Sequence, residues 1–187
     1  MAVAIDATPG GASANSYLTL NDAQAIVDGF VQDADVTAWA SATTDQKNRA
    51  LFTATQRLDR ERFLGARSTD TQALQWPRTG VRKPDTYINT YAVGFPFRIT
   101  TDYFDDTEIP TQVKYAQVVL AVFLHNNPDS LGLSGLEDYK NVSIGSISVT
   151  PNLGCGAVGA DKVPPIMERY LTGLRISGPG NFAIKRS

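Results

Sequence analysis

The chain has 187 residues, of which 42% are hydrophobic and 19% charged, with a formal net charge of −2. This size and composition fit one folded domain and exclude both a disordered chain and two ordinary domains. The longest apolar run, Val118 to Leu124, is far shorter than the roughly 20 residues of a membrane span, so no membrane association is expected. The net charge argues against a protein dedicated to coating nucleic acid, because Lys and Arg supply most of that affinity.

The charges are arranged in blocks of alternating sign. Residues 1–46 carry six acids and no base, whereas residues 47–83 carry nine bases and three acids. Residues 84–108 carry one base and five acids, and residues 162–187 carry five bases and one acid. Such blocks either let the acidic region of one copy meet the basic region of another, or they are ordinary solvated faces.

The chain begins with small and polar residues. Residues 1–16 show no periodicity and predict a flexible N-terminal arm. Either Thr19 or Asn21 can cap a first helix, because either side chain can accept a hydrogen bond from a free N–H of the first turn. Trp39 is expected in a short connecting turn. The apolar residues of this first helix are Ala23, Ile26, Val27, Phe30 and Val31.

The clearest helix pattern follows. Thr43 and Gln46 have the spacing of a capping box at the start of this helix. No helix breaker occurs from Ala50 to Leu64, and the helix is expected to end at Gly65. A one-sided apolar stripe of this kind has to pack on other helices. The stripe consists of Leu51, Ala54, Thr55 and Leu58.

The segment 84–108 is predicted to be a long, loop-rich insertion. Its many aromatic residues argue against disorder, so we expect a β-hairpin or extended lobe between Tyr87 and Tyr103. The aromatic residues are Tyr87, Tyr91, Phe95, Phe97, Tyr103 and Phe104.

The remaining chain predicts two more helices and a β element. Pro110 suits the first turn of a helix that is apolar nearly all round, the pattern of the buried helix in a bundle. Residues 141–149 alternate around a glycine, which indicates a bulged strand or a tight hairpin. Pro164 and Pro165 open a short last helix, and residues 176–187 are expected to form an extended C-terminal arm.

The predicted fold is therefore mainly α. We expect a single domain over 1–187: a helical bundle with a small β-hairpin or strand element, whose core spans 17–175 and carries the insertion 84–108.

No residue pattern predicts catalysis, a cofactor site or a metal site. Residues 154–159 match GxGxxG, but Pro164 and Pro165 interrupt the helix that would hold the phosphates, and a glycine loop is the simpler interpretation. His125 lacks partners close in sequence and suits the end of the buried helix. Cys155 is interpreted as a small filler and the acids at 105–108 as a solvated turn. The protein is expected not to be an enzyme.

Five pieces of sequence in a fixed order do carry a resemblance. They are ALFTATQRLDRERFLG at 50–65, QALQWPR at 72–78, Ile109-Pro110, VSIGSISV at 142–149 and Val163-Pro164-Pro165. This order resembles the phage head-to-tail adaptor proteins, also called head-completion or connector proteins. Many of their relatives carry the label DnaT-like single-stranded DNA-binding protein. The resemblance covers about residues 15–175, and this chain departs from it in the insertion Tyr87 to Phe104 and in a longer tail.

The resemblance implies a structural virion protein. Such subunits are made in the host cytoplasm and assemble as a homo-oligomeric ring, commonly a dodecamer, beneath the portal protein in the neck of the virion. The ring extends the channel, through which genomic DNA passes without sequence specificity. Its other side meets a tail, stopper or nozzle protein.

Three groups of residues are candidates for these roles. Trp76 and Pro77 are interpreted as a structural anchor in the core. Arg78, Arg82 and Lys83 either line the lumen, meet acids of a neighbouring subunit, or belong to a solvated loop. The C-terminal arm is interpreted as the portal-docking segment, with a tail of no consequence as the alternative. Its docking residues are Arg175, Phe182, Ile184, Lys185 and Arg186.

The alternative function is single-stranded DNA binding. It requires aromatic side chains that stack on bases inside a basic groove. The aromatic residues gather in 87–104, where the net charge is negative, whereas the bases gather in 47–83. This separation along the chain argues against the alternative.

Overall fold

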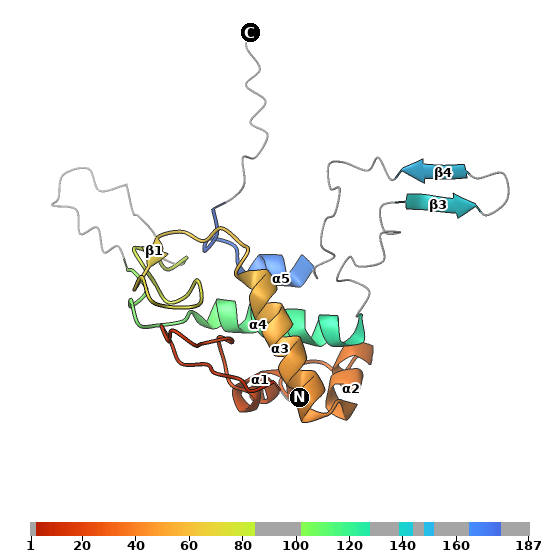
Figure 1. Cartoon of the computed structure of the whole chain (residues 1–187), viewed down its shortest axis with the longest axis horizontal. Coiled ribbons are helices and arrows are strands. Elements are labelled where there is room, and N and C mark those ends of the chain that lie inside the picture. Colours follow the sequence, from red (N-terminus) through yellow and green to blue (C-terminus); the bar gives the residue numbers. More distant parts are fainter. Residues whose placement is uncertain (1–2, 85–101, 128–138, 144–147, 152–164, 177–187) are drawn as a thin grey trace, which may run out of the picture.

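The computed structural model describes residues 3–84, 102–127, 139–143, 148–151 and 165–176, and in these segments the chain is mainly helical (Figure 1). The helices are α1 (Leu20–Val27), α2 (Ala34–Ser41), α3 (Thr44–Leu58), α4 (Thr111–Asn126) and α5 (Pro165–Tyr170). Four short strands form two antiparallel pairs, β1 (Ala66–Arg67) with β2 (Arg78–Thr79) and β3 (Tyr139–Ser143) with β4 (Ser148–Pro151). The predicted fold class, a helical bundle with a small β element, is confirmed.

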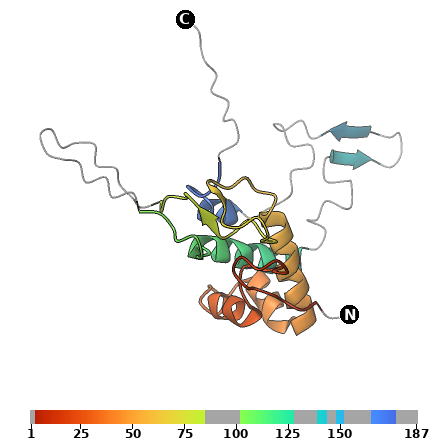
Figure 2. The same cartoon turned by 60° about the vertical axis from the view of Figure 1, so that its left-hand side comes forward.

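Helix α4 lies at the centre of the bundle. The other four helices all contact it, and Figure 2 shows α3 crossing it. The prediction that this helix is buried is confirmed. Most of its apolar side chains are buried, and Val113, Val118 and Leu120 are fully buried. None of the helices in the described ranges is both long enough and apolar enough to span a membrane.

A buried glutamine ties α4 to the rest of the core. The Gln117 side-chain oxygen accepts a hydrogen bond from the Tyr17 backbone N–H at 3.1 Å. Its Nε2 donates to Ser16 Oγ at 2.7 Å and to Thr55 Oγ1 at 2.8 Å. Because Gln117 has no solvent exposure, these bonds replace the water that its amide would otherwise require.

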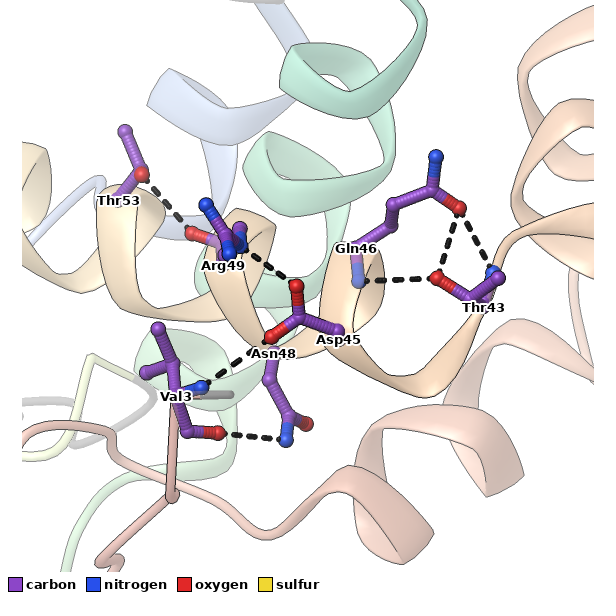
Figure 3. A network of polar contacts seen from close by, with 7 residues as sticks. All are labelled: Val3, Thr43, Asp45, Gln46, Asn48, Arg49 and Thr53. Carbon is purple, nitrogen blue, oxygen red and sulfur yellow. Dashed lines mark hydrogen bonds and ion pairs between the residues drawn. The ribbon is translucent and has the colours of Figure 1, made fainter. Parts of the chain in front are cut away.

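The helix starts follow the capping residues of the sequence. Thr19, and not Asn21, caps α1, since its side chain accepts a hydrogen bond from the N–H of Asp22 in a capping box. Thr43 and Gln46 form the predicted capping box of α3, which is visible at the right of Figure 3.

Two helix boundaries differ from the prediction. Helix α1 ends at Val27, so Phe30 and Val31 lie in the following loop and not on its apolar face. Helix α3 ends at Leu58, not at Leu64. Beyond it the chain turns, and the Leu64 N–H donates to the carbonyl of Leu174 at 2.9 Å. A long-range pairing thus takes the place of the last helical turn.

Gly65 does not cap the helix. It has a φ of +72°, and a Cβ added there would collide with the carbonyl oxygen of Thr79. The glycine therefore permits the close approach of β1 to β2.

Trp39 belongs to α2 and not to a connecting turn. Its side chain is fully buried, and its indole N–H donates to Gln24 at 3.2 Å. Val36 is buried on the same helix, one turn earlier, so α2 packs a short apolar face on the bundle.

The N-terminal segment is tied to the bundle and is not a free arm, and Figure 3 shows its residue Val3 bonded to side chains of α3. The Val3 backbone N–H donates to the Asp45 carboxylate at 3.2 Å, and its carbonyl accepts from the Asn48 amide at 2.8 Å. Ala14 is buried. The small polar side chains of this segment gave no periodicity, but the bonds of Val3 to α3 and of the Gly11 carbonyl to the Ala73 N–H fix its backbone.

Candidate interaction surfaces

An apolar groove of about 320 Å³ lies between the loop 30–33 with the start of α2, the second half of α4, and α5. Val31 and Ile166 on its walls are 87% and 49% exposed. Such a surface on a small protein marks an interaction site, because water contact with large apolar side chains is unfavourable. The groove was not predicted from the sequence, because helical spacing placed Val31 on the first helix. The main apolar side chains that line it are Phe30, Val31, Val119, Val122, Phe123 and Ile166.

Two aspartates give the groove a negative rim. Asp33 caps α2, and its Oδ1 accepts from the Val36 N–H at 2.8 Å. The Asp35 carboxylate accepts a hydrogen bond from the Asn126 amide of α4. No Lys or Arg lines the groove in the part of the chain that is described. The groove therefore combines an apolar floor with an acidic edge.

Arg78 points into the protein, which corrects its assignment as a lumen or inter-subunit residue. Its side chain is 7% exposed. Nε donates to the carbonyl of Leu64 at 2.7 Å, and Nη2 donates to that of Gly65 at 2.7 Å and that of Phe63 at 3.3 Å. Nη1 donates to both oxygens of Gln75. Five acceptors are what the planar guanidinium can satisfy, so Arg78 fastens residues 63–65, which follow α3, to Gln75 and β2.

Arg82 and Lys83 lie where the two ends of the insertion meet. The backbone of Arg82 pairs antiparallel with that of Tyr103, and the Lys83 N–H donates to the carbonyl of Asp102 at 2.9 Å. The Lys83 ammonium lies 3.3 Å from the Asp102 carboxylate and 5.9 Å from the centre of the Phe104 ring. Arg82 itself is exposed.

The pairing of Arg82 with Tyr103 brings an aromatic residue next to a base. Tyr103 is 43% exposed and lies beside Arg82. The separation of aromatic residues from bases along the chain is therefore not a separation in space at this point. The predicted hairpin between Tyr87 and Tyr103 falls on residues 85–101, outside the described ones.

Trp76 and Pro77 lie in the core, where an anchor belongs. Trp76 is 1% exposed and contacts the rings of Phe63 and Phe104 edge-on, at centroid distances of 5.5 Å and 6.4 Å. The peptide bond between Trp76 and Pro77 is cis. Phe104 brings the insertion's second end into the same cluster.

Arg175 is held by the body of the protein, which corrects its place in the docking arm. Its guanidinium lies 3.5 Å from Glu61 and 3.7 Å from Glu168, and its backbone pairs with Phe63. An arginine with two acidic partners is not available for a partner's acidic groove. The other four docking residues, Phe182, Ile184, Lys185 and Arg186, lie outside the described residues, as do Cys155 and the glycine loop 154–159.

A second exposed surface lies beside this pairing. The Ile176 N–H donates to the carbonyl of Arg62 at 2.7 Å, which places these two residues side by side. Ile176 is 52% exposed and Leu64 is 37% exposed. Arg60 and Arg62 are exposed too, and neither has an ion pair within the described part of the chain. We call these four residues the Leu64 patch.

A hydrogen bond between a buried tyrosine and a partly buried aspartate was not predicted from the sequence. The Tyr17 hydroxyl donates a hydrogen bond to the Asp59 carboxylate at the end of α3. Burial, and after it the charge of Asp59, raises the pKa of Tyr17 well above 10.0. Burial also raises the pKa of Asp59 above its ordinary 3.8. The pair joins the N-terminal segment to α3, and only the three-dimensional contact reveals it.

The remaining candidates have structural surroundings. His125 lies in the last turn of α4 and meets Trp39 edge-on at 6.1 Å. Asp105 accepts hydrogen bonds from the backbone and hydroxyl of Thr107, which lower the pKa of its carboxyl. Within the described residues no three His, Cys, Asp or Glu side chains lie close enough together to hold a metal ion.

The protein is therefore small and mainly helical, and it exposes an apolar groove and the Leu64 patch. The family model described as "Putative DnaT-like ssDNA binding protein" matches residues 1–186, and the chain belongs to this family. Searches of curated proteins and of solved structures returned no match.

Proposed function

We propose that this protein is a head-to-tail adaptor, a structural subunit of a ring beneath the portal in the virion neck. It is not an enzyme in this proposal. The ring extends the DNA channel and connects it to a tail, stopper or nozzle protein. The resemblance supports the proposal, and its five pieces lie at α3, the Trp76-Pro77-Arg78 segment, α4, the pair β3–β4 and α5.

The observation that carries the proposal is the open groove. A chain whose task is assembly needs surfaces that are exposed in the single copy and covered in the particle. Val31, at 87% exposure, is such a surface residue. Catalysis, in contrast, needs converging polar groups in a pocket, and the groove lining is mostly apolar.

The portal-docking segment in this proposal is residues 177–187. With Arg175 bound to Glu61 and Glu168, the docking residues that remain are Phe182, Ile184, Lys185 and Arg186. Phe182 and Ile184 are two apart, so both would face one way if the segment adds to a partner as a strand.

The test is co-sedimentation with rings of a portal protein from the same genome. The full chain should sediment with the portal rings, and a variant lacking residues 178–187 should not, although its melting temperature stays unchanged. Failure of the full chain to sediment with the portal contradicts the adaptor function. Full occupancy by the truncated chain contradicts only the docking segment and assigns docking to the bundle.

Single-stranded DNA binding is the second candidate function. The family description and the exposed Tyr103 beside Arg82 favour it, because stacking aromatics next to bases bind single strands. The acidic block 84–108 opposes it, and we expect negligible binding at about 150 mM salt. Fluorescence anisotropy with a labelled oligonucleotide measures this. Submicromolar binding that is lost in an Arg82→Ala, Tyr103→Ala variant would replace the adaptor function.

A further inference from the structure

We propose that the acid-rimmed groove of one copy receives the Leu64 patch of a neighbouring copy. The inference rests on the proposed ring only for the closing of the assembly. The contact between two copies stands on the surfaces themselves.

Apolar contacts match between the two surfaces. Leu64 and Ile176 are the exposed apolar side chains of the patch, and they lie on neighbouring backbone segments. The groove has a volume of about 320 Å³ and an apolar lining, with Val31 and Ile166 exposed on its walls. Insertion of Leu64 and Ile176 would remove apolar surface from water on both copies, which favours association.

Charges match as well. Asp33 and Asp35 form the groove rim, and no base lines the groove within the described residues. The patch carries Arg60 and Arg62, while the acid between them, Glu61, is already paired with Arg175. The rim belongs to the acidic block 1–46 and the two arginines of the patch to the basic block 47–83, so the charge blocks of the sequence acquire a specific pair of surfaces.

The contact joins unlike surfaces, and in the proposed ring it is head to tail. A two-fold contact of groove with groove would bring the aspartates of two copies together, and one of patch with patch would bring arginines together; like charges at an interface are strongly unfavourable. A head-to-tail contact leaves a free groove at one end and a free patch at the other. Repeated, it closes into a ring or extends as a filament.

The contact should also be weak in isolation. A stable interface buries about 1,200 to 2,000 Å², and the patch consists of four side chains that are partly exposed. Rings would therefore form where a partner holds several copies side by side. An experiment must accordingly trap a transient contact.

Disulfide trapping does this in the full chain with Cys155→Ser as the background. Val31→Cys places a thiol at the groove and Leu64→Cys places one in the patch. Mixed together under mild oxidation, the two variants should form a mixed disulfide dimer faster than either forms a dimer alone. Thr69→Cys, at an exposed position outside the patch, replaces Leu64→Cys in the control mixture.

Charge reversal tests the rim. Asp35→Lys, added to the groove variant, should slow the mixed disulfide by about tenfold or more, because it faces arginine. Arg62→Glu, added to the patch variant, should restore the rate. Asp28→Lys is the matched control, since Asp28 is exposed, belongs to the same acidic block and does not line the groove. Melting temperatures verify that each variant is folded.

The proposal is overturned if the mixture reacts no faster than its control, if Val31→Cys alone dimerises as fast, or if Arg62→Glu gives no rescue. No portal protein is present, so these results are independent of the adaptor function. A chain that sediments with portal but shows no trapping refutes the groove contact alone. Trapping without portal binding refutes the adaptor alone.

Discussion

Replacing Arg78 with alanine distinguishes its buried structural role from the exposed roles predicted from the sequence. A lumen residue or a solvated residue could be truncated without loss of stability. The buried guanidinium, however, donates to the carbonyls of Phe63, Leu64, Gly65 and Gln75 and to the Gln75 side chain. Alanine would leave these acceptors in a cavity of the protein interior.

The magnitude follows from the acceptors that water cannot reach. A buried polar group left without a partner costs about 1 to 3 kcal/mol. If two of the five acceptors stay dry and the rest are hydrated, the free energy of unfolding falls by about 2 to 6 kcal/mol. For a chain of this size, each kcal/mol lowers the melting temperature by about 2 to 4 °C, so a fall near 10 °C is expected.

Urea unfolding followed by circular dichroism gives the free energy of unfolding for wild type and variant. Arg82→Ala is the control, because Arg82 is exposed and surface substitutions usually change stability by no more than about 0.5 kcal/mol. Arg78→Lys should recover only part of the loss, since an ammonium cannot reach five acceptors. Equal stability of Arg78→Ala and Arg82→Ala would refute the structural role of Arg78.

Three other substitutions test further parts of the structure. Burial raises the pKa of Asp59, so the folded chain keeps a proton that the unfolded chain releases; the free energy of unfolding therefore falls as pH rises from 3.8 through the raised pKa, and Asp59→Asn should lack this fall in urea titrations at several pH values. Gln117→Leu should cost about 3 kcal/mol, because it leaves the Tyr17 N–H unpaired in the core, and unchanged stability would contradict this. Thr43→Ala removes the α3 cap and should cost about 1 kcal/mol by thermal melting, whereas Thr43→Ser should cost less.

The elements governed by local sequence could be predicted. Thr43 and Gln46 specify the start of α3 by hydrogen bonds within one turn. Pro110 marks the start of α4, because a residue without an N–H loses nothing at a helix start. The alternation in 141–149 predicted a bulged strand or a tight hairpin, and the structure has the antiparallel pair β3–β4.

What depends on distant residues could not be predicted. The end of α3 is set by the pairing of Leu64 with Leu174, which are far apart in the sequence. Arg78 looks like an exposed base until the loop carbonyls around it are known. The groove forms because α1 ends at Val27, which leaves Val31 in a loop. Helical spacing alone cannot show where a helix stops.

The closed base of the insertion has a consequence for how this chain can vary. Hydrogen bonds from Lys83 to Asp102 and from Phe104 to Val81 join the two strand-like ends before residue 85 and after residue 101. The entropy of closing a loop rises only slowly with its length. The hydrogen-bonded ends therefore keep their positions whatever the length of the segment between them. A two-residue turn or a longer segment could replace residues 85–101, and Trp76, Phe104 and the helices would keep their places.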